Sequence, residues 1–188
     1  MERRVVITGI GALTPIGNNT AEFWDGLKNG KNGIAHITKF DTEAVQSKAV
    51  CAGELKNFDP TTVVEKKETK RLDMFSIYGM AVADEAVKMS GIDLESIDKH
   101  KFGVVFGSGI GGLTTIEEQG RRLVEKGINK IAPLFIPMAI SNMAAGNIAI
   151  RFGARGTCID VVTACASSTN CIGEAFRNIK HGYSDYII

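Results

Sequence analysis

The chain is poor in the residues that build metal sites and disulfide frameworks, with four cysteines and three histidines among 188 residues. No two cysteines form a C-x-x-C pair and no histidine stands at metal-ligand spacing, which argues against zinc. Cys51 lies far from the other three cysteines, so we expect no disulfide framework. The sequence therefore predicts a protein of a reducing compartment, the cytoplasm, without a bound metal.

Excess charge and long apolar runs are also missing. The net charge of +1 gives no general attraction to nucleic acid or to a membrane, so any partner must be bound by a local patch. The N-terminus shows no apolar signal core. The only long uncharged run, 131–150, is interrupted by proline, asparagine and glycine, which favours a buried loop and helix over a membrane span. We expect one globular domain, no nucleic-acid partner and no membrane contact.

The stretch from Cys158 to Asn170 organises the rest of the chain. Its β-branched residues favour a strand, and the small residues around Cys165 permit a turn directly into a helix. We expect this helix to run from about Ala166 to His181, with Gly182 as its left-handed stop. Cys165 is then placed at the junction of the strand and the helix.

That position has chemical consequences. The first N–H groups of a helix lack internal partners and lie at the positive end of the helix dipole. A thiol placed there is favoured as thiolate, the form that attacks carbonyls, and the same N–H groups can stabilise an oxyanion. The alternative for any free cysteine is a small buried hydrophobe, and we assign that role to Cys51, Cys158 and Cys171.

Periodicity and turn residues predict the remaining elements. Gly9 and Gly11 do not complete a dinucleotide fingerprint, because Thr14 replaces its third glycine, and 107–112 lacks the lysine of a P-loop. In the first half of the chain we expect a buried strand at Val5–Thr8, a helix from Asn19 to Gly30 and an irregular region with short strands at 33–60. A helix over Leu72–Ser90 follows, with Phe75, Val82, Ala86 and Met89 as its apolar face. In the second half we expect a strand at Phe102–Phe106, an amphipathic helix over Leu113–Lys126, a helix with Pro137 at its first position, and a strand within Tyr183–Ile188.

A positively charged run, 65–71, precedes the helix expected at Leu72–Ser90. Such a run is most often a solvated helix face, and a docking patch for an acidic partner is the alternative.

Several motifs together resemble one family. Val162-Thr-Ala-Cys-Ala-Ser-Ser is similar to the nucleophile motif of the β-ketoacyl-acyl-carrier-protein synthases, and most to that of the synthase II group. The resemblance extends over essentially the whole chain, in family order and spacing, through Arg4-Val-Val-Ile-Thr-Gly-Ile-Gly, Thr14-Pro-Ile-Gly, Phe40-Asp, Gly107-Ser-Gly-Ile-Gly-Gly, Ile136-Pro and Asn142-Met.

This resemblance implies a fold and an incomplete site. The fold is the N-terminal βαβαβαββ half, residues 1–188, of a five-layer αβαβα thiolase-like architecture. A C-terminal half would supply two catalytic histidines and a second oxyanion N–H. His36, His100 and His181 match neither histidine motif. We therefore expect a truncated N-terminal domain that is inactive alone.

The resemblance also implies a reaction and its residues. Cys165 would accept an acyl group, which a carbanion from malonyl-carrier protein attacks with loss of CO₂, in fatty-acid biosynthesis and without a cofactor. Ile110, Phe135 and Ala164 would bind the acyl chain, with Ile110 as a gate and Phe135 reaching the partner's pocket in a homodimer. Acyl-carrier protein would dock on Lys67, Lys70, Arg71 and Lys130.

Three alternatives remain open at this point. A thiolase or synthase III shares the fold and the cysteine at a helix entrance. A polyketide ketosynthase shares the motifs as well. A chain-length-factor-like partner keeps the fold and has lost its nucleophile, so the presence of Cys165 argues against it.

Overall fold

A computed structural model of the protein describes residues 3–188. At its centre is a three-stranded parallel sheet with the order β4-β3-β5. The middle strand β3 (Phe102–Phe106) pairs with β4 (Cys158–Asp160) in the register Phe106↔Asp160, and with β5 (Tyr186–Ile187) in the register Phe102↔Tyr186. Strand β3 is an almost continuous apolar run and is buried, as expected for the centre of a parallel sheet.

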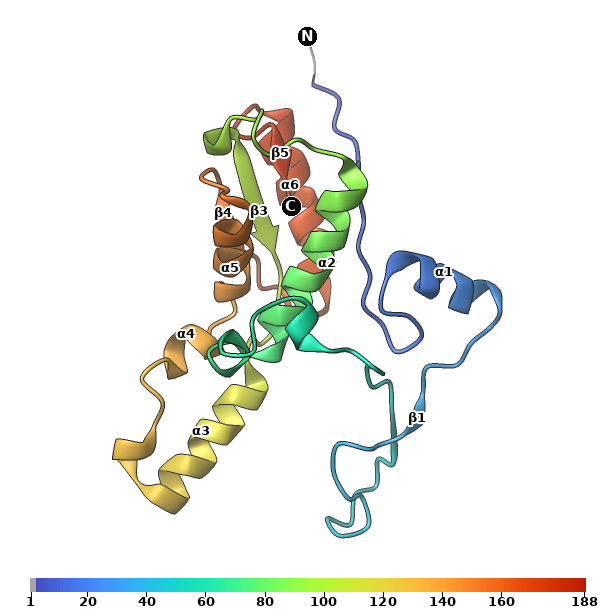
Figure 1. The fold of residues 1–188 in the computed structure, drawn as a ribbon, viewed down its shortest axis with the longest axis vertical. Helices are drawn as coiled ribbons and strands as arrows, with labels where there is room; N and C mark the ends of the chain where they lie inside the picture. The colour runs from blue at the N-terminus through green and yellow to red at the C-terminus, as the bar shows by residue number, and fades with distance from the viewer. Residues whose placement is uncertain (1–2) are drawn as a thin grey trace.

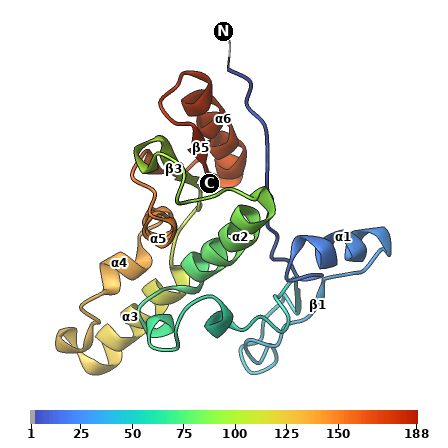
Figure 2. The same cartoon turned by 45° about the horizontal axis from the view of Figure 1, so that its top comes forward.

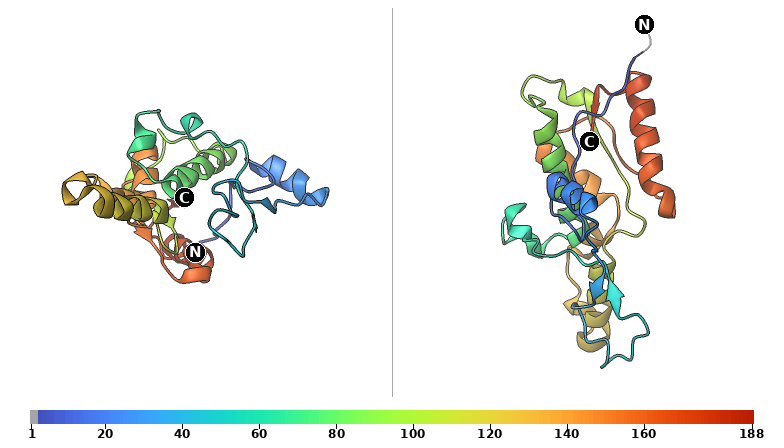
Figure 3. Two further views of the ribbon diagram at one scale, coloured as in Figure 1. Left: turned by 90° about the horizontal axis from the view of Figure 1, so that it is seen from below. Right: turned by 90° about the vertical axis from the view of Figure 1, so that its right-hand side faces the viewer.

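Helices cover both faces of this sheet. α2 (Met74–Ser90) and α5 (Met143–Phe152) pack on one face, and α6 (Ser167–Lys180) packs on the other (Figure 3). The main hydrophobic core lies between α2, α5 and β3, where Ile77, Val104 and Ile148 are at most 1% exposed. The mixed α/β architecture predicted from the sequence is therefore present.

The other elements project from this centre (Figures 1 and 2). On one side lie α1 (Thr20–Lys28) and the antiparallel pair β1 (Ala35–His36) and β2 (Cys51–Ala52). On the other lies what we call the arm, which comprises α3 (Leu113–Lys126), the 3₁₀ turn η4 (Ile128–Lys130) and α4 (Phe135–Ala139). None of the helices within 3–188 is long and apolar enough to cross a bilayer.

Helix ends follow the chemistry read from the sequence. Asn19 caps α1 by accepting the N–H of Glu22 at 2.8 Å. Gly91 and Gly182 follow α2 and α6 with φ of +64° and +79°, the left-handed region that glycine occupies without strain. The helix bounds at Leu113–Lys126 and the strand bounds at Phe102–Phe106 are confirmed.

The strand predicted at Val5–Thr8 is wrong. This segment pairs with no strand among the described residues, and Val6 and Ile7 are 55% and 81% exposed. It runs instead beside α2, where the N–H of Ala12 donates to the carboxylate of Glu85 at 2.9 Å (Figure 1). An apolar run alone does not make a strand, because a strand also needs a neighbour within hydrogen-bonding distance.

The core face of α2 also differs from the predicted one. Ile77, Met80 and Ala83 are buried, whereas Met89 of the predicted face is 51% exposed. Val82 and Ala86 face the N-terminal segment, whose Gly9 and Gly11 lie against their backbone. Because α2 is apolar around most of its circumference, periodicity did not distinguish the side that meets the core.

The helix predicted to begin at Pro137 begins earlier. α4 starts at Phe135 and ends at Ala139, and a separate helix, α5, starts at Met143. Pro137 is tolerated within α4 because its missing N–H falls in the first turn of a helix, where no partner is available.

Candidate active site

Cys165 lies in a short turn between β4 and α6. The chain leaves β4 at Asp160, passes through Val161–Thr163, forms the 3₁₀ turn η5 (Ala164–Ala166) and enters α6 at Ser167. The predicted strand therefore ends earlier, and the predicted helix begins one residue later. We call residues 161–167 the Cys165 turn. The side chain of Cys165 is exposed at the entrance to α6.

The backbone of this turn is strained at Ala164. Its φ is +49°, a left-handed conformation that residues other than glycine adopt only with strain. The hydroxyl of Ser167 accepts the N–H of Thr163 at 3.0 Å and donates to the carbonyl of Ala164 at 2.7 Å. The amide of Asn170 donates to the Thr163 hydroxyl at 2.8 Å. These bonds hold the strained turn in place.

Ser167 and Asn170 were not assigned a role from the sequence. Ser167 lies three residues after Ala164 and four after Thr163, a spacing at which short polar side chains commonly bond to the backbone. Asn170 lies seven residues after Thr163 and donates to its side chain, so the sequence carried no such signal for it. Ser167 is 5% exposed, so its two bonds are shielded from water.

The Cys165 turn is exposed to solvent and lies at the N-terminal end of α6. The backbone N–H of Cys165 makes no hydrogen bond within residues 3–188, so it is available to an incoming oxygen. The N–H of Ala166, in contrast, donates to the carbonyl of Thr163. The positive end of α6 points toward the same place. This arrangement suits a nucleophile that forms an oxyanion beside its own backbone.

The end of β3 supports the turn from below. A Cβ on Gly107 would lie 2.7 Å from Cys171 Sγ and 3.2 Å from Ser167 Cβ, so only glycine fits there. Cys171 is 8% exposed, and burial raises the pKa of its thiol above the ordinary value. Cys171 is thus the buried residue that was predicted, whereas the same prediction is wrong for Cys51 and Cys158, which are exposed in short edge strands.

Ile110 lies close to the same edge of the sheet. Because β3 and β4 are parallel, the segment after β3 and the segment after β4 emerge side by side. We call residues 107–112 the glycine loop. Its start lies against Ser167, and the N–H of Gly112 at its end donates to the carbonyl of Ala139 in α4 at 2.8 Å. Ile110 is 65% exposed at the tip of this loop.

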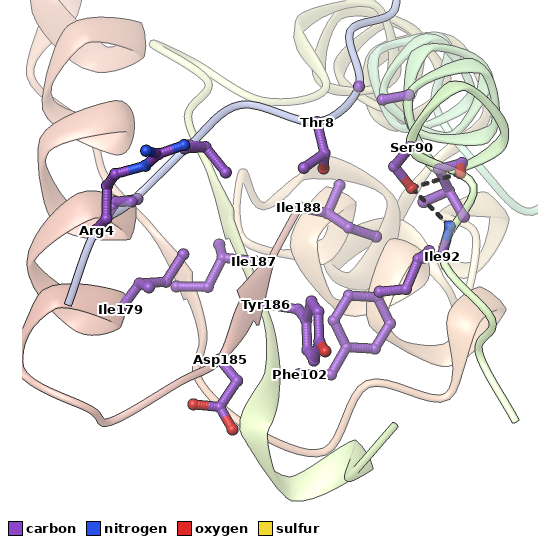
Figure 4. A pocket seen from close by; sticks show the side chains of 15 residues that line it. Arg4, Thr8, Ser90, Ile92, Phe102, Ile179, Asp185, Tyr186, Ile187 and Ile188 are labelled. Atoms are coloured by element: carbon purple, nitrogen blue, oxygen red, sulfur yellow. Dashed lines mark hydrogen bonds between the residues drawn. The ribbon is translucent and has the colours of Figure 1, made fainter. Parts of the chain in front are cut away.

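The predicted acyl-chain residues lie on three segments that meet at the glycine loop. Ala164 belongs to the Cys165 turn, Ile110 to the loop and Phe135 to α4, which packs against the end of the loop. Phe135 is half-buried. None of the three lines the cavity of about 320 Å³ in Figure 4, which lies between the N-terminal segment, α2 and β5.

The predicted carrier-docking residues divide into two places. Lys67, Lys70 and Arg71 are exposed in and around the 3₁₀ turn η2 (Glu68–Lys70), just before α2. Lys67 forms an ion pair with Glu65 at 2.7 Å. Lys130 is exposed in η4, past the end of α3. No cluster of three or more metal-ligating side chains occurs in the part of the chain that the structure describes.

The fold is thiolase-like and is shared with solved ketosynthase structures. One solved structure of this class, a type II polyketide synthase acyl-carrier protein in complex with its ketosynthase bound to the hexaketide, superposes with a TM-score of 0.82. The match covers 98% of this chain and 49% of that chain, at 24% sequence identity. It confirms the fold class predicted from the sequence.

Sequence comparison identifies the family. Residues 2–188 match the model of the β-ketoacyl synthase N-terminal domain, and the chain belongs to this family. It is 42% identical to 3-oxoacyl-[acyl-carrier-protein] synthase 2 of Synechocystis sp. (strain ATCC 27184 / PCC 6803 / Kazusa), over 100% of this chain and 44% of that protein. It is 45% identical to the protein of the same name from Staphylococcus aureus (strain COL), over 99% of this chain and 44% of the relative. The chain thus spans less than half the length of these relatives.

Proposed function

We propose that this chain is the nucleophile-bearing part of a 3-oxoacyl-[acyl-carrier-protein] synthase that elongates acyl chains in fatty-acid biosynthesis. The observation that carries the proposal is the position of Cys165, exposed on a strained turn at the start of α6, in a chain 42% identical to the Synechocystis synthase. A thiolate there attacks carbonyls, and the fixed dipoles around it act without reorganisation.

The reaction has two half-steps at Cys165. First, Sγ forms a bond to the acyl carbonyl carbon while the bond from that carbon to the carrier sulfur breaks, and the carrier leaves as a thiol. The free N–H of Cys165 stabilises the oxyanion of this step. Malonyl-carrier protein then loses CO₂, its carbanion attacks the acyl carbon, and the Cys165 thiolate leaves. By the family resemblance, the histidines that assist decarboxylation would lie in the part of the relatives that extends beyond the match to this chain.

The proposed partner is acyl-carrier protein bearing acyl and malonyl thioesters. Lys67, Lys70 and Arg71 are exposed cations on one short segment, which suits an acidic partner. A carrier protein is bound to the ketosynthase in the solved complex described above, which supports the same class of partner here. We propose that Lys130 contributes from the arm.

We further propose a cytoplasmic homodimer. The arm exposes large apolar side chains, including Val124 at 86% and Ile128 at 69%, and a second copy of the chain would cover them. The four cysteines are free, which is consistent with a reducing compartment.

A polyketide ketosynthase is the second candidate, because the polyketide ketosynthase structure shares the fold at a TM-score of 0.82. The fatty-acid role is preferred because identity to the two synthase 2 relatives is 42% and 45%, against 24% for that structure.

The test is a condensation assay on the full-length protein with Cys165→Ala. The variant should lose acyl transfer from acyl-carrier protein by about 10³-fold or more, because removing a covalent nucleophile leaves only binding and oxyanion stabilisation. Cys51→Ala, which removes another exposed thiol, should keep wild-type activity. Undiminished transfer in Cys165→Ala would refute the role, and preference for coenzyme A thioesters over carrier thioesters would favour a thiolase or synthase III.

A further inference from the structure

The glycine loop is fixed at its two ends and free at its tip. At its start, the N–H of Ser108 donates to Asp160 Oδ1 at 3.2 Å. Within it, the N–H of Gly111 donates to the Ser108 hydroxyl at 3.0 Å. Between these bonds, a Cβ on Gly109 would meet no atom within 4 Å, and Ile110 is 65% exposed. The position of Ile110 is therefore set by the bonds at the loop ends and not by packing at its tip.

Asp160 connects this loop to the nucleophile. It is the last residue of β4, and the chain continues from it directly into the Cys165 turn. The next residue, Val161, donates its N–H to the carbonyl of Phe106 at 2.9 Å, immediately before the glycine loop. The side chain of Asp160, directly before the Cys165 turn, thus holds the glycine loop that carries Ile110.

Asp160 is an unusual residue for this place. Aspartate is disfavoured in strands, and Asp160 Oδ2 is buried without a hydrogen-bond partner among residues 3–188. A buried carboxylate oxygen without a partner destabilises the fold, so an aspartate at this position is better explained by a functional role than by stability. Asp160 also lies close enough to Cys171 to add to the rise in the pKa of that thiol, which burial causes first and a hydrogen bond with the backbone of Val161 opposes.

We propose that Asp160 is a positioning residue that sets acyl-chain selectivity by fixing the loop that carries Ile110. This inference rests on the proposed function, since it assumes that the acyl chain bound to Cys165 extends past Ile110. With the Ser108 bond present, Ile110 is held at one position and limits the length of chain that fits. When the bond from Ser108 to Asp160 is removed, the glycine loop can move and the enzyme accepts longer acyl chains more readily.

The test measures kcat/KM of the full-length enzyme for long-chain and short-chain acyl groups on acyl-carrier protein. Asp160→Ala removes the acceptor and should raise the long-to-short ratio about five-fold, the effect of one hydrogen bond. Asp160→Asn keeps an acceptor oxygen and should stay within about two-fold of wild type. Asp98→Ala removes a comparable acceptor, for the N–H of His100 at 2.8 Å in the distant turn η3 (Lys99–Lys101), and should leave the ratio unchanged.

A double-mutant cycle separates positioning from general destabilisation. In an Ile110→Gly background, Asp160→Ala should no longer change the ratio, because the side chain being positioned is gone. If Asp160→Ala does not fold, Ser108→Ala serves instead, since it removes the acceptor for Gly111 and should shift the ratio in the same direction. An unchanged ratio in a folded Asp160→Ala enzyme, or in Ser108→Ala where the former does not fold, overturns the inference. A wild-type enzyme that forms no acyl-enzyme at all contradicts the proposed function instead.

Discussion

The sheet region and the arm differ in which side chains they bury, mainly apolar in the first and mainly polar in the second. We call the sheet β4-β3-β5 with α2, α5 and α6 the sheet region. Around β3, the apolar residues of α2 and α5 that face the core are buried, with Ile77 and Ile148 at most 1% exposed. In α3 the buried residues are polar, Thr115 and Gln119, while Val124 is 86% exposed. The sheet region therefore has an apolar core of its own, whereas the apolar side chains of the arm are largely left uncovered by this chain.

The largest expected effect comes from removing core volume in the sheet region. Ile148→Ala deletes a side chain that is 1% exposed, and it should lower the free energy of unfolding by about 3 kcal/mol through lost burial and the cavity left behind. Denaturant titration of the full-length protein measures this loss.

The matched variant in the arm is Val124→Ala. It deletes an apolar side chain that is 86% exposed, so it should change the unfolding free energy by less than about 0.5 kcal/mol at protein concentrations where the protein is monomeric. Equal losses for Ile148→Ala and Val124→Ala would contradict the distinction between the two regions.

Asp73 connects the two regions. Its carboxylate accepts the N–H of Phe75 at 3.1 Å at the start of α2, and the N–H and hydroxyl of Thr115 at 3.0 and 2.6 Å at the start of α3. The same side chain thus caps two helices, and it is 6% exposed. Asp73→Ala should lower the unfolding free energy by about 2 kcal/mol, because it leaves several buried donors without an acceptor.

Thermal or denaturant unfolding of Asp73→Ala measures that effect, with Asp98→Ala as the control. Asp98 accepts one N–H at the start of a 3₁₀ turn, so its loss should be smaller. Hydrogen exchange at the first turn of α3 should rise in Asp73→Ala and not in the control. Unchanged exchange there would show that the arm is attached by other contacts.

The smallest expected effect concerns the pH dependence that Cys171 gives to the stability of the fold. Burial raises the pKa of Cys171, so the folded state holds this thiol neutral at a pH where the unfolded chain ionises it. Its contribution to stability is complete below the ordinary thiol pKa, and it is lost as the pH rises from that value through the raised one. Cys171→Ala should therefore show a shallower decline of stability at alkaline pH than wild type, measured by denaturant titration across that range. An equally steep decline would assign it to other groups.

The sequence predicted best where local chemistry decides the structure. Asn19, Gly91 and Gly182 mark helix ends because their side chains or backbone freedom act within one turn, and β3 is apolar enough to belong only in a buried strand. The motif around Cys165 predicted both the turn and the family.

Prediction failed where contacts with residues distant in the sequence decide the structure. Val5–Thr8 has the composition of a strand and no neighbouring strand among the described residues, and α2 has apolar residues on more than one side. The positions of Cys51 and Cys158 follow from edge strands that the sequence did not locate. The bonds from Ser167, Asn170 and Asp160 depend on the geometry of the folded turn and loop.

The most direct test of the account is to locate the acyl group after a single half-reaction. Full-length protein is mixed with acyl-carrier protein bearing a saturated acyl chain and digested with a protease that cleaves before aspartate. The cut at Asp160 separates Cys158 from Cys165, and the peptides are analysed by mass spectrometry. Cys51 and Cys158 are exposed thiols in the same chain and serve as internal controls. The account predicts that the acyl mass appears on the peptide containing Cys165 and on neither control peptide. Acylation spread over all three exposed cysteines, or absent from Cys165, would contradict it.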